Sequence, residues 1–508
     1  PRRRLAGAGA GLLLAVVVVF GLAAPPERCP AVSAAGLRDA AREAVAWFVR
    51  NQEPDGQWLY RYDATTDTAY AEYNVIRHGG VLMALYQAAG ADLPGALASA
   101  DRGVEWATDR LAERGDWTAL RSGGELPVGA TALLTAGLAE RRLVTGDPTH
   151  DDLLRRLGQF LVDQIEPSGA VIASYDLAAD RAAAGVYSRY YTGEAYWALT
   201  RLHQLFPDEG WGATADLIGA YMAGPRDDVE GYWPPLPDHW AAYGQAETVS
   251  FPERAGVALS DVEADYARRQ AGLFGGQVRW LSQRAGPWGA LVRGPFVPRG
   301  GGYGVIGEAL TGLWLTSAAE PELADARPEI AARARCVAGL AVAAQADREE
   351  AADFAEPDRV LGAWFRDGET RMDDQQHALS GLLRTIPIVA SGEGDGSTDG
   401  AGPSAWLWVA LVVAGLNPFR AAFGVPRAAR SRRDVALVAG LGGLIGMTAV
   451  VAAAAIGGPL VDAVGASEPA VRIGAGAVAA IVGLSDLLRP PPAPDPAWPG
   501  WRAALVPV

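Results

Sequence analysis

Apolar residues recur at spacings of three and four along residues 34–390, a pattern typical of amphipathic helices. The pattern is clear in windows such as Leu37–Val49, Ala130–Leu138 and Ala195–Leu205, which Gly, Pro and Asp separate. Alternation of the strand type is scarce. The sequence therefore predicts about a dozen helices, with starts near residues 36, 72, 97, 128, 150, 192, 211, 238, 261, 304, 327 and 374.

The connections between these helices alternate in length. Longer loops, such as Glu53–Thr68 and Glu166–Ser188, follow the odd-numbered helices, and short turns follow the even-numbered ones. Antiparallel helix pairs repeated about six times bury a continuous core when they close into a ring. We therefore expect an all-α fold, an (α/α)6 toroid over residues 34–390, in which the even-numbered helices lie inside and start at one rim.

The two ends of the chain differ in composition from the middle. Three Arg residues precede an apolar run, Leu5–Ala24, so residues 1–33 are expected to hold a membrane anchor or a signal segment. Residues 391–403 are rich in Gly, Ser and Asp, which is typical of a flexible linker. Val435–Ile456 is uncharged and two shorter apolar runs flank it, so we expect a multi-span transmembrane region over residues 404–508. The alternative for the shorter runs is a re-entrant or interfacial helix.

The positions of Arg predict an orientation in the membrane. Five Arg residues lie in one loop, between Arg420 and Arg433. The positive-inside rule places this loop and the N-terminal Arg cluster in the cytoplasm. We therefore expect a protein of the cell membrane, with the lipid bilayer as a partner and the large domain on the extracytoplasmic side.

Charge and motif content argue against several classes of function. The formal net charge is -15, and a surface that acidic disfavours nucleic-acid binding. The two cysteines, Cys29 and Cys336, lack zinc-type spacing, and a disulfide between them is one option. The sequence contains no P-loop, dinucleotide-binding, HExxH or GxSxG motif, so we expect no cofactor and no metal. A metal site built from His239, Asp238 and His377 is the alternative.

A short repeat follows two of the predicted helices. Residues 52–58 read Gln-x-x-x-Gly-x-Trp, and residues 164–169 echo the pattern in part. Gly permits a left-handed turn. Gln can cap the end of the helix before this turn, and Trp can stack on the turn. We interpret this repeat as a structural turn without a catalytic role.

Four short polar clusters begin even-numbered helices: Tyr73–His78, Tyr190–Glu194, Asp238–Trp240 and Asp373–His377. Helix starts carry unpaired backbone N–H groups and the positive end of the helix dipole. In a ring these starts meet at one rim, where they would build a site rich in Tyr, His, Arg and carboxylate. Those are groups that bind and process sugars.

The clusters supply candidates for each role. Glu194 and Asp238 are the expected acid and base, Asp373 can replace either, and His78 is a further candidate for proton transfer. The alternative for these carboxylates is helix capping. The same alternative applies to Glu308, which follows a Gly-rich loop. The candidates for substrate binding are Tyr73, Asn74, Arg77, Tyr190, Tyr191, His239, Trp240, Gln376 and His377.

The order of these motifs resembles that of bacterial six-hairpin glycosidase-like domains. The matching segments, within residues 35–388, are YDxxT, YNxxRHGGxLxAL, YYTGEAxxAL, DHW and DxxQHALSxLL. The resemblance implies an (α/α)6 fold and a carbohydrate-related role without specifying a substrate. Residues 417–420 (Asn-Pro-Phe-Arg) open a loop between two expected spans and resemble part of a MarC-type membrane protein.

These observations predict a membrane-tethered glycoside hydrolase-like protein that acts on cell-envelope or extracellular glycan with two carboxylates. The first alternative is a uronic-acid polysaccharide lyase or epimerase. In that reaction Arg77 and Asn74 would hold the sugar carboxylate while His78 or a Tyr moves the C5 proton. The second alternative is a non-catalytic glycan-binding sensor coupled to the membrane helices.

Overall fold

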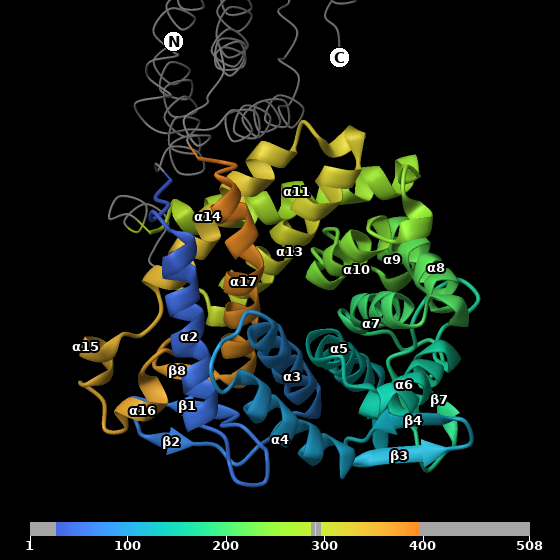
Figure 1. Cartoon of the computed structure of the whole chain (residues 1–508), viewed down its shortest axis with the longest axis horizontal. Coiled ribbons are helices and arrows are strands. Elements are labelled where there is room, and N and C mark those ends of the chain that lie inside the picture. Colours follow the sequence, from blue (N-terminus) through green and yellow to red (C-terminus); the bar gives the residue numbers. More distant parts are fainter. Residues whose placement is uncertain (1–26, 286–289, 291–295, 396–508) are drawn as a thin grey trace, which may run out of the picture. The chain divides into compact units, whose positions relative to one another are not determined.

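The computed structural model describes residues 27–285, 290 and 296–395 (Figure 1). The apolar run at residues 5–24, most of the linker and the MarC-like region at residues 404–508 lie outside the described residues. Within the described ranges, no helix is both long and apolar enough to cross a membrane.

In the part of the chain that the structure describes, twelve long helices alternate between an outer and an inner layer. The outer helices are α2 (Ala34–Arg50), α4 (Ala96–Thr108), α6 (Asp151–Asp163), α8 (Trp211–Ala223), α11 (Asp261–Ser282) and α14 (Arg327–Ala343). The inner helices are α3 (Val75–Gly90), α5 (Val128–Thr145), α7 (Tyr191–Leu205), α10 (His239–Val249), α13 (Gly300–Ala319) and α17 (Met372–Ser391). Short helices in the connections are α9 (Arg226–Glu230), α15 (Arg348–Ala351), α16 (Pro357–Val360) and the 3-10 turns Pro148–His150, Pro207–Glu209, Pro252–Arg254 and Pro321–Leu323.

The inner helices form a closed ring. Each packs against the next in chain order, and α17 packs against α3 to complete the circle (Figure 1). The predicted starts lie close to the observed ones, and the largest difference is at α13, which was expected near residue 304 and begins at Gly300. The all-α toroid predicted from helical periodicity is therefore confirmed for the described part of the chain.

Short strands occupy the longer loops. One antiparallel sheet has the order β2-β1-β8, with β1 (Arg61–Asp63), β2 (Thr68–Ala69) and β8 (Glu369–Arg371). A hairpin joins β3 (Leu111–Arg114) to β4 (Trp117–Leu120), and a third sheet has the order β5-β6-β7, with β5 (Glu125–Pro127), β6 (Ser174–Asp176) and β7 (Arg181–Ala182). The pairing of β1 with β8 joins the loop after α2 to the residue before α17, so it ties the two ends of the ring together.

Close helix contacts position the site. A Cβ atom on Gly304 of α13 would overlap the backbone of His377 on α17, and Gly381 lies against Gly304 in the same way. Glycine is required there because no other residue allows the two backbones to approach so closely. The contact brings Glu308, one turn further along α13, beside His377.

The repeated Gln-x-x-x-Gly-x-Trp segment is a turn, as predicted. Gly56 has a φ of 96°, in the left-handed region. The Gln52 amide donates to the Gly56 carbonyl and, at 3.0 Å, to the Ser99 carbonyl of α4. The Trp58 indole donates to the Ser99 hydroxyl, so the turn fastens the end of α2 to α4.

A disulfide joins Cys29, before α2, to Cys336 of α14, with Cα atoms 4.7 Å apart. Beside it, the Glu27 carboxylate accepts from the Ser282 hydroxyl of α11 at 3.0 Å and pairs with Arg333 of α14. The segment before α2 is therefore fastened to α11 and α14 by one covalent bond and one partly buried charge.

Candidate functional site

The starts of the inner helices bring charged groups from several helices together. Arg77 of α3 lies with Nε 3.4 Å from Oδ2 of Asp373 on α17. The charge of Arg77 also acts on Glu194 of α7 and on His239 of α10. We call Arg77, Asp373, Glu194 and His239, together with Glu308 and His377 described below, the rim cluster. In the ring α17 is adjacent to α3, and α7 is adjacent to α10.

Arg77 is the electrostatic centre of this cluster. Burial acts to lower its pKa, but the negative charges of Asp373 and Glu194 outweigh burial and raise the pKa above the usual value. An arginine is charged in any case, so the useful consequence is for its neighbours. Arg77 stabilises negative charge on either carboxyl group.

Glu194 is a buried carboxyl group without a partner. Its side chain is 2% exposed, and Oε2 has no hydrogen bond within the described part of the chain. Burial raises its pKa to about 8, with Arg77 lowering the value and Asp238 adding a smaller increase. Glu194 is therefore mostly protonated at neutral pH, which is the state that a general acid needs.

Two imidazoles and a carboxylate form the other half of the cluster. His377 Nδ1 lies 2.8 Å from Oε2 of Glu308, and His239 Nε2 lies 3.7 Å from the same oxygen. The two rings are 5.1 Å apart between centroids. Burial, assisted by the charges of His377 and Arg77, lowers the pKa of His239 well below its usual value, so His239 is neutral at pH 7. Among the described residues these three side chains form the one group whose geometry can hold a metal ion.

Tyrosines stand beside the cluster at the start of α7. Tyr190 is 37% exposed, and its ring centroid lies 6.5 Å from that of His239. Burial raises the pKa of Tyr191 to about 12, and the charge of Glu194 adds to the effect. The Tyr191 phenol therefore keeps its proton at neutral pH and can donate a hydrogen bond to a sugar.

Trp240 lies in the core. It is 2% exposed and packs against Trp197, at 5.5 Å, and Tyr243, at 5.7 Å between centroids. A sugar cannot stack on a ring that is buried to this extent. The Trp240 ring also packs against the imidazoles of His239 and His377.

Asp238 has every oxygen engaged. It is the N-cap of α10 and accepts from the backbone N–H groups of Trp240 and Ala241. Its other oxygen lies 2.6 Å from Nη1 of Arg226, and the side chain is fully buried. These contacts assign Asp238 to capping and charge pairing, the alternative that the sequence left open.

Tyr73 and His78 face the outer helix α4. His78 Nε2 donates to the Gly103 carbonyl at 2.8 Å, so Nδ1 of the neutral ring accepts from the Tyr73 hydroxyl at 2.7 Å. Burial lowers the pKa of His78 to about 3. Asn74 caps α3 by accepting from the backbone N–H groups of Ile76 and Arg77. The contacts of these three residues differ from those expected of a proton-transfer or sugar-binding group.

Gln376 is a buried neighbour of the cluster. Its amide nitrogen lies 3.3 Å from His377 Nδ1, and its oxygen fills the space beside Gly80 of α3. Two further acidic residues lie close by. Glu308, for which the sequence left helix capping as an alternative, binds His377. Asp374, which was not among the candidate site residues, binds Arg299 at 3.1 Å, and burial raises its pKa to about 6.

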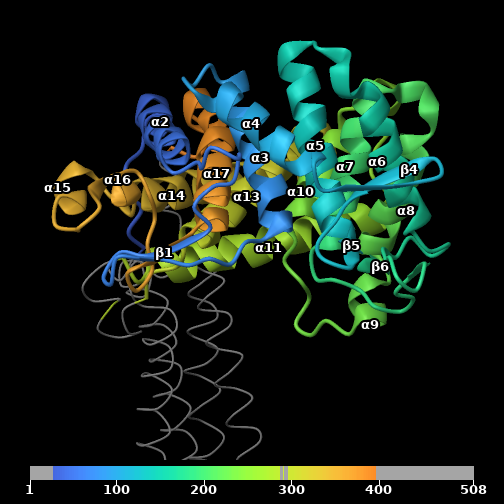
Figure 2. The ribbon, with the colours of Figure 1, turned by 90° about the horizontal axis from the view of Figure 1, so that it is seen from below.

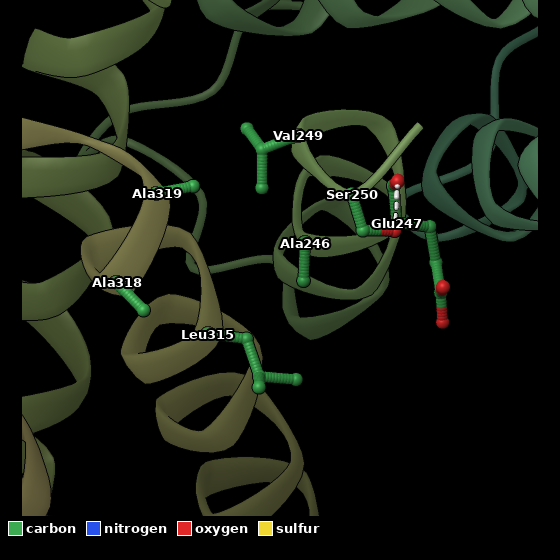
Figure 3. A pocket seen from close by; sticks show the side chains of 7 residues that line it. All are labelled: Ala246, Glu247, Val249, Ser250, Leu315, Ala318 and Ala319. Carbon is green, nitrogen blue, oxygen red and sulfur yellow. Dashed lines mark hydrogen bonds between the residues drawn. The ribbon is translucent and has the colours of Figure 1, made fainter. Parts of the chain in front are cut away.

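The best-formed hollows described in the structure lie elsewhere. One, of about 420 Å³, separates the C-terminal ends of α10 and α13, where Leu315 and Ala318 face Ala246 and Val249 (Figure 3). The second, of about 440 Å³, lies beside α14 and is lined by Glu43, Gln345, Arg348 and neighbours. Neither is lined by the rim cluster. The first is walled mostly by apolar side chains, and its Glu247 is already paired with Arg201 of α7. We therefore place the candidate site at the rim cluster.

The chain is similar to several solved structures at low sequence identity. No family model matches the chain, and no curated protein is similar to it. A cellobiose 2-epimerase from Spirochaeta thermophila has a TM-score of 0.49 and 14% identity over 70% of this chain and 98% of its own. An unsaturated glucuronyl hydrolase specific for heparin has a TM-score of 0.47 and 11% identity over 70% and 98%. A family 76 mannosidase from Bacteroides thetaiotaomicron has a TM-score of 0.45 and 11% identity over 71% and 99%.

These three similarities lie at sequence identities of 11% to 14%. At such low identity they do not transfer an activity to this chain. We therefore argue its function from the residues of the rim cluster.

Proposed function

We propose that the ring domain is a carbohydrate-active enzyme that cleaves glycosidic bonds, with Glu194 as the general acid. The observation that carries this proposal is a buried carboxyl group without a partner whose pKa of about 8 keeps it protonated at neutral pH. A glycosidic oxygen is a poor leaving group until it gains a proton, and a carboxylic acid in an apolar pocket supplies one.

Arg77 completes the acid step. When Glu194 gives its proton to the glycosidic oxygen, the C–O bond breaks and a carboxylate remains. Arg77 is the nearby positive charge that acts on Glu194 and stabilises this carboxylate. Arg77 therefore stabilises the Glu194 carboxylate that forms during the reaction more than the neutral acid that is present before it.

Asp373 is the second carboxylate of the proposal. It replaces Asp238, because Asp238 is held by Arg226 and two backbone amides. Asp373 is ion-paired with Arg77 through Oδ2, while its Oδ1 atom is buried without a hydrogen bond in the described structure. That oxygen can accept the proton of a water molecule as the water attacks the sugar.

The substrate class follows from the surroundings of these groups. Tyr190 and Tyr191 supply aromatic surface and hydroxyl donors at the start of α7, and the sequence motifs resemble those of six-hairpin glycosidase-like domains. We propose a cell-envelope or extracellular glycan as substrate. Disulfides persist in oxidising compartments, so the Cys29–Cys336 bond supports an extracytoplasmic domain. Tethering to the membrane stays a prediction from residues 1–33 and 404–508.

The test is a screen of the full chain against bacterial glycans for released reducing ends. The proposal expects release from at least one glycan by the wild type and none by Glu194→Gln. A glycan that binds with a measurable Kd and is not cleaved would instead support the sensor alternative. Absence of both binding and cleavage over the whole panel would count against a carbohydrate function.

A second candidate, proton transfer at a sugar carbon as in an isomerase or epimerase, is favoured by the two facing imidazoles. His239 is neutral at pH 7 and has no hydrogen bond at either ring nitrogen, so it can accept a proton. In this reading His239 and His377 take the place that the sequence gave to His78. Reaction in D2O separates the candidates, because carbon proton transfer places deuterium on the sugar carbon and hydrolysis does not.

A further inference from the structure

His239, Glu308 and His377 form a compact cluster of potential metal ligands inside the ring. They come from three different inner helices, α10, α13 and α17, which pack side by side. Their exposed fractions are 3%, 0% and 5%. One potential ligand atom from each lies within 4.8 Å of the other two. The Gly304–Gly381 contact between α13 and α17 holds two of the three ligands in place.

The hydrogen bonding of the cluster is incomplete. Both ring nitrogens of His239 and the Oε1 atom of Glu308 are buried without a partner in the described structure. Among the described residues, the Glu308 side chain has one hydrogen bond, with His377 Nδ1 at 2.8 Å. A buried carboxylate with one oxygen unpaired costs free energy unless a cation or further donors satisfy it. A small cation between the three side chains would interact with both the nitrogen and the oxygen atoms.

We propose that His239, Glu308 and His377 bind a divalent transition-metal ion, with Zn²⁺ as the best match. Two imidazole nitrogens and one carboxylate oxygen are a ligand set of catalytic zinc sites, which keep a fourth position open for water or substrate. Ligand atoms of a tetrahedral zinc site lie about 3.3 Å apart, given bond lengths of about 2.0–2.1 Å. The observed separations of 2.8 Å and 3.7 Å lie on either side of that value. Side-chain rotation alone can therefore bring the atoms to the metal.

Charge and protonation are compatible with this site. Glu308 supplies one negative charge, and Asp373 offsets the nearby positive charge of Arg77 through their ion pair. A neutral imidazole binds a metal through one ring nitrogen and keeps its proton on the other, so two neutral imidazoles and one carboxylate can bind Zn²⁺ without a net release of protons.

The proposal goes beyond glycoside cleavage by Glu194 and gives the two imidazoles a specific role. As ligands, the two imidazoles would hold a cation beside the substrate. They would then not exchange protons with the substrate, as the isomerase candidate requires. The open fourth position would bind a water molecule or a sugar hydroxyl. The acid step at Glu194 does not depend on the ion, so failure of one proposal leaves the other intact.

Direct binding of Zn²⁺ tests the site. The full chain is purified, treated with a chelator, dialysed and titrated with Zn²⁺ by calorimetry. We expect one bound equivalent. His239→Ala, His377→Ala and Glu308→Gln should each weaken binding by at least about 100-fold. His150→Ala is the matched control, because His150 lies on the turn between α5 and α6 and should leave binding unchanged.

Cobalt provides a second measurement that does not depend on calorimetry. Co²⁺ in the same site should give the visible absorption of a four- or five-coordinate ion, without a thiolate band because both cysteines form the disulfide. Circular dichroism shows whether each variant is folded, and His239→Asn serves if the alanine variant is not. Failure to bind Zn²⁺ in stoichiometric amount, or equal binding by wild type and folded His239 and His377 variants, would overturn the proposal.

Discussion

Gly129 and Glu194 share one space at the rim of the ring. A Cβ atom on Gly129, in the first turn of α5, would overlap both Oε2 of Glu194 and the ring of Tyr191 on α7. The absence of a side chain at position 129 is therefore what lets the proposed general acid and its neighbouring phenol occupy their places.

Gly129→Ala should reduce activity more than stability. The new methyl group has to displace Glu194 or Tyr191, and misplacement of a catalytic group by about 1 Å costs roughly 10–100-fold in rate. Overpacking should cost about 1–3 kcal/mol of unfolding free energy. Turnover and urea denaturation are the measurements. Gly272→Ala in α11 is the control, because a Cβ there meets open space. It should keep full activity and gain about 0.5–1 kcal/mol. Equal activity in the two variants would show that Glu194 is not constrained by Gly129.

Asp238→Asn should destabilise the fold. Asparagine still caps α10, but it leaves the buried Arg226 without its nearest charge, at a cost of about 3–5 kcal/mol. Denaturant unfolding measures this loss. Asp347→Asn is the matched control, since Asp347 caps the short exposed helix α15 in the same way without a buried arginine. A stable Asp238→Asn protein with strongly reduced turnover would return Asp238 to the catalytic role that the sequence suggested.

Reduction of the Cys29–Cys336 bond should lower the melting temperature. The bond closes a loop with a sequence separation of 307 residues, and loss of such a crosslink costs about 2–5 kcal/mol. Thermal melting with and without reductant measures the effect, and the Cys29→Ser, Cys336→Ser double variant should melt like the reduced wild type in both conditions. If reductant leaves the wild-type melting temperature unchanged, the ion pairs of Glu27 are sufficient to fasten the segment.

The stability of the protein should depend on pH through Glu194. Its pKa is raised from 4.5 to about 8 on folding. Between these values the folded state keeps a proton that the unfolded chain has released, so unfolding free energy falls as pH rises through this window. Glu194→Gln has no such proton. The stability of the variant relative to wild type should therefore rise from pH 4.5 to pH 8 and level off above it. Parallel stability curves would mean that Glu194 is not buried in its neutral form.

The helices could be predicted from the sequence because the spacing of apolar residues shows which face of a helix is buried. The direction in which the polar residues of those helices point could not be predicted. Arg77 and His78 are adjacent, yet a helix turns about 100° per residue, so Arg77 joins Asp373 while His78 binds Gly103 of the outer helix α4. Only the position of the neighbouring helices decides which of the two reaches the rim.

Asp238 and Glu308 illustrate two further limits. An aspartate before a helix has the same sequence pattern whether it caps the helix or performs catalysis, and its partner Arg226 lies in a separate short helix. Glu308 is in the third turn of α13, so it was not part of any cluster at a helix start. Its place in the site depends on the close approach of α13 to α17 at Gly304, which periodicity does not reveal.

The most direct test of the account is the pH–rate profile of glycan cleavage by wild type and by Glu194→Gln. Wild-type turnover should fall about tenfold per pH unit above the Glu194 pKa of about 8, because the acid form is then depleted.

Glu194→Gln should lose about 10²–10⁴-fold in kcat at pH 7 and lose this alkaline limb, with a melting temperature at least as high as that of the wild type. The exposed Glu105→Gln variant should behave as wild type. An active Glu194→Gln protein with an unchanged pH profile would contradict the assignment of Glu194 as the acid.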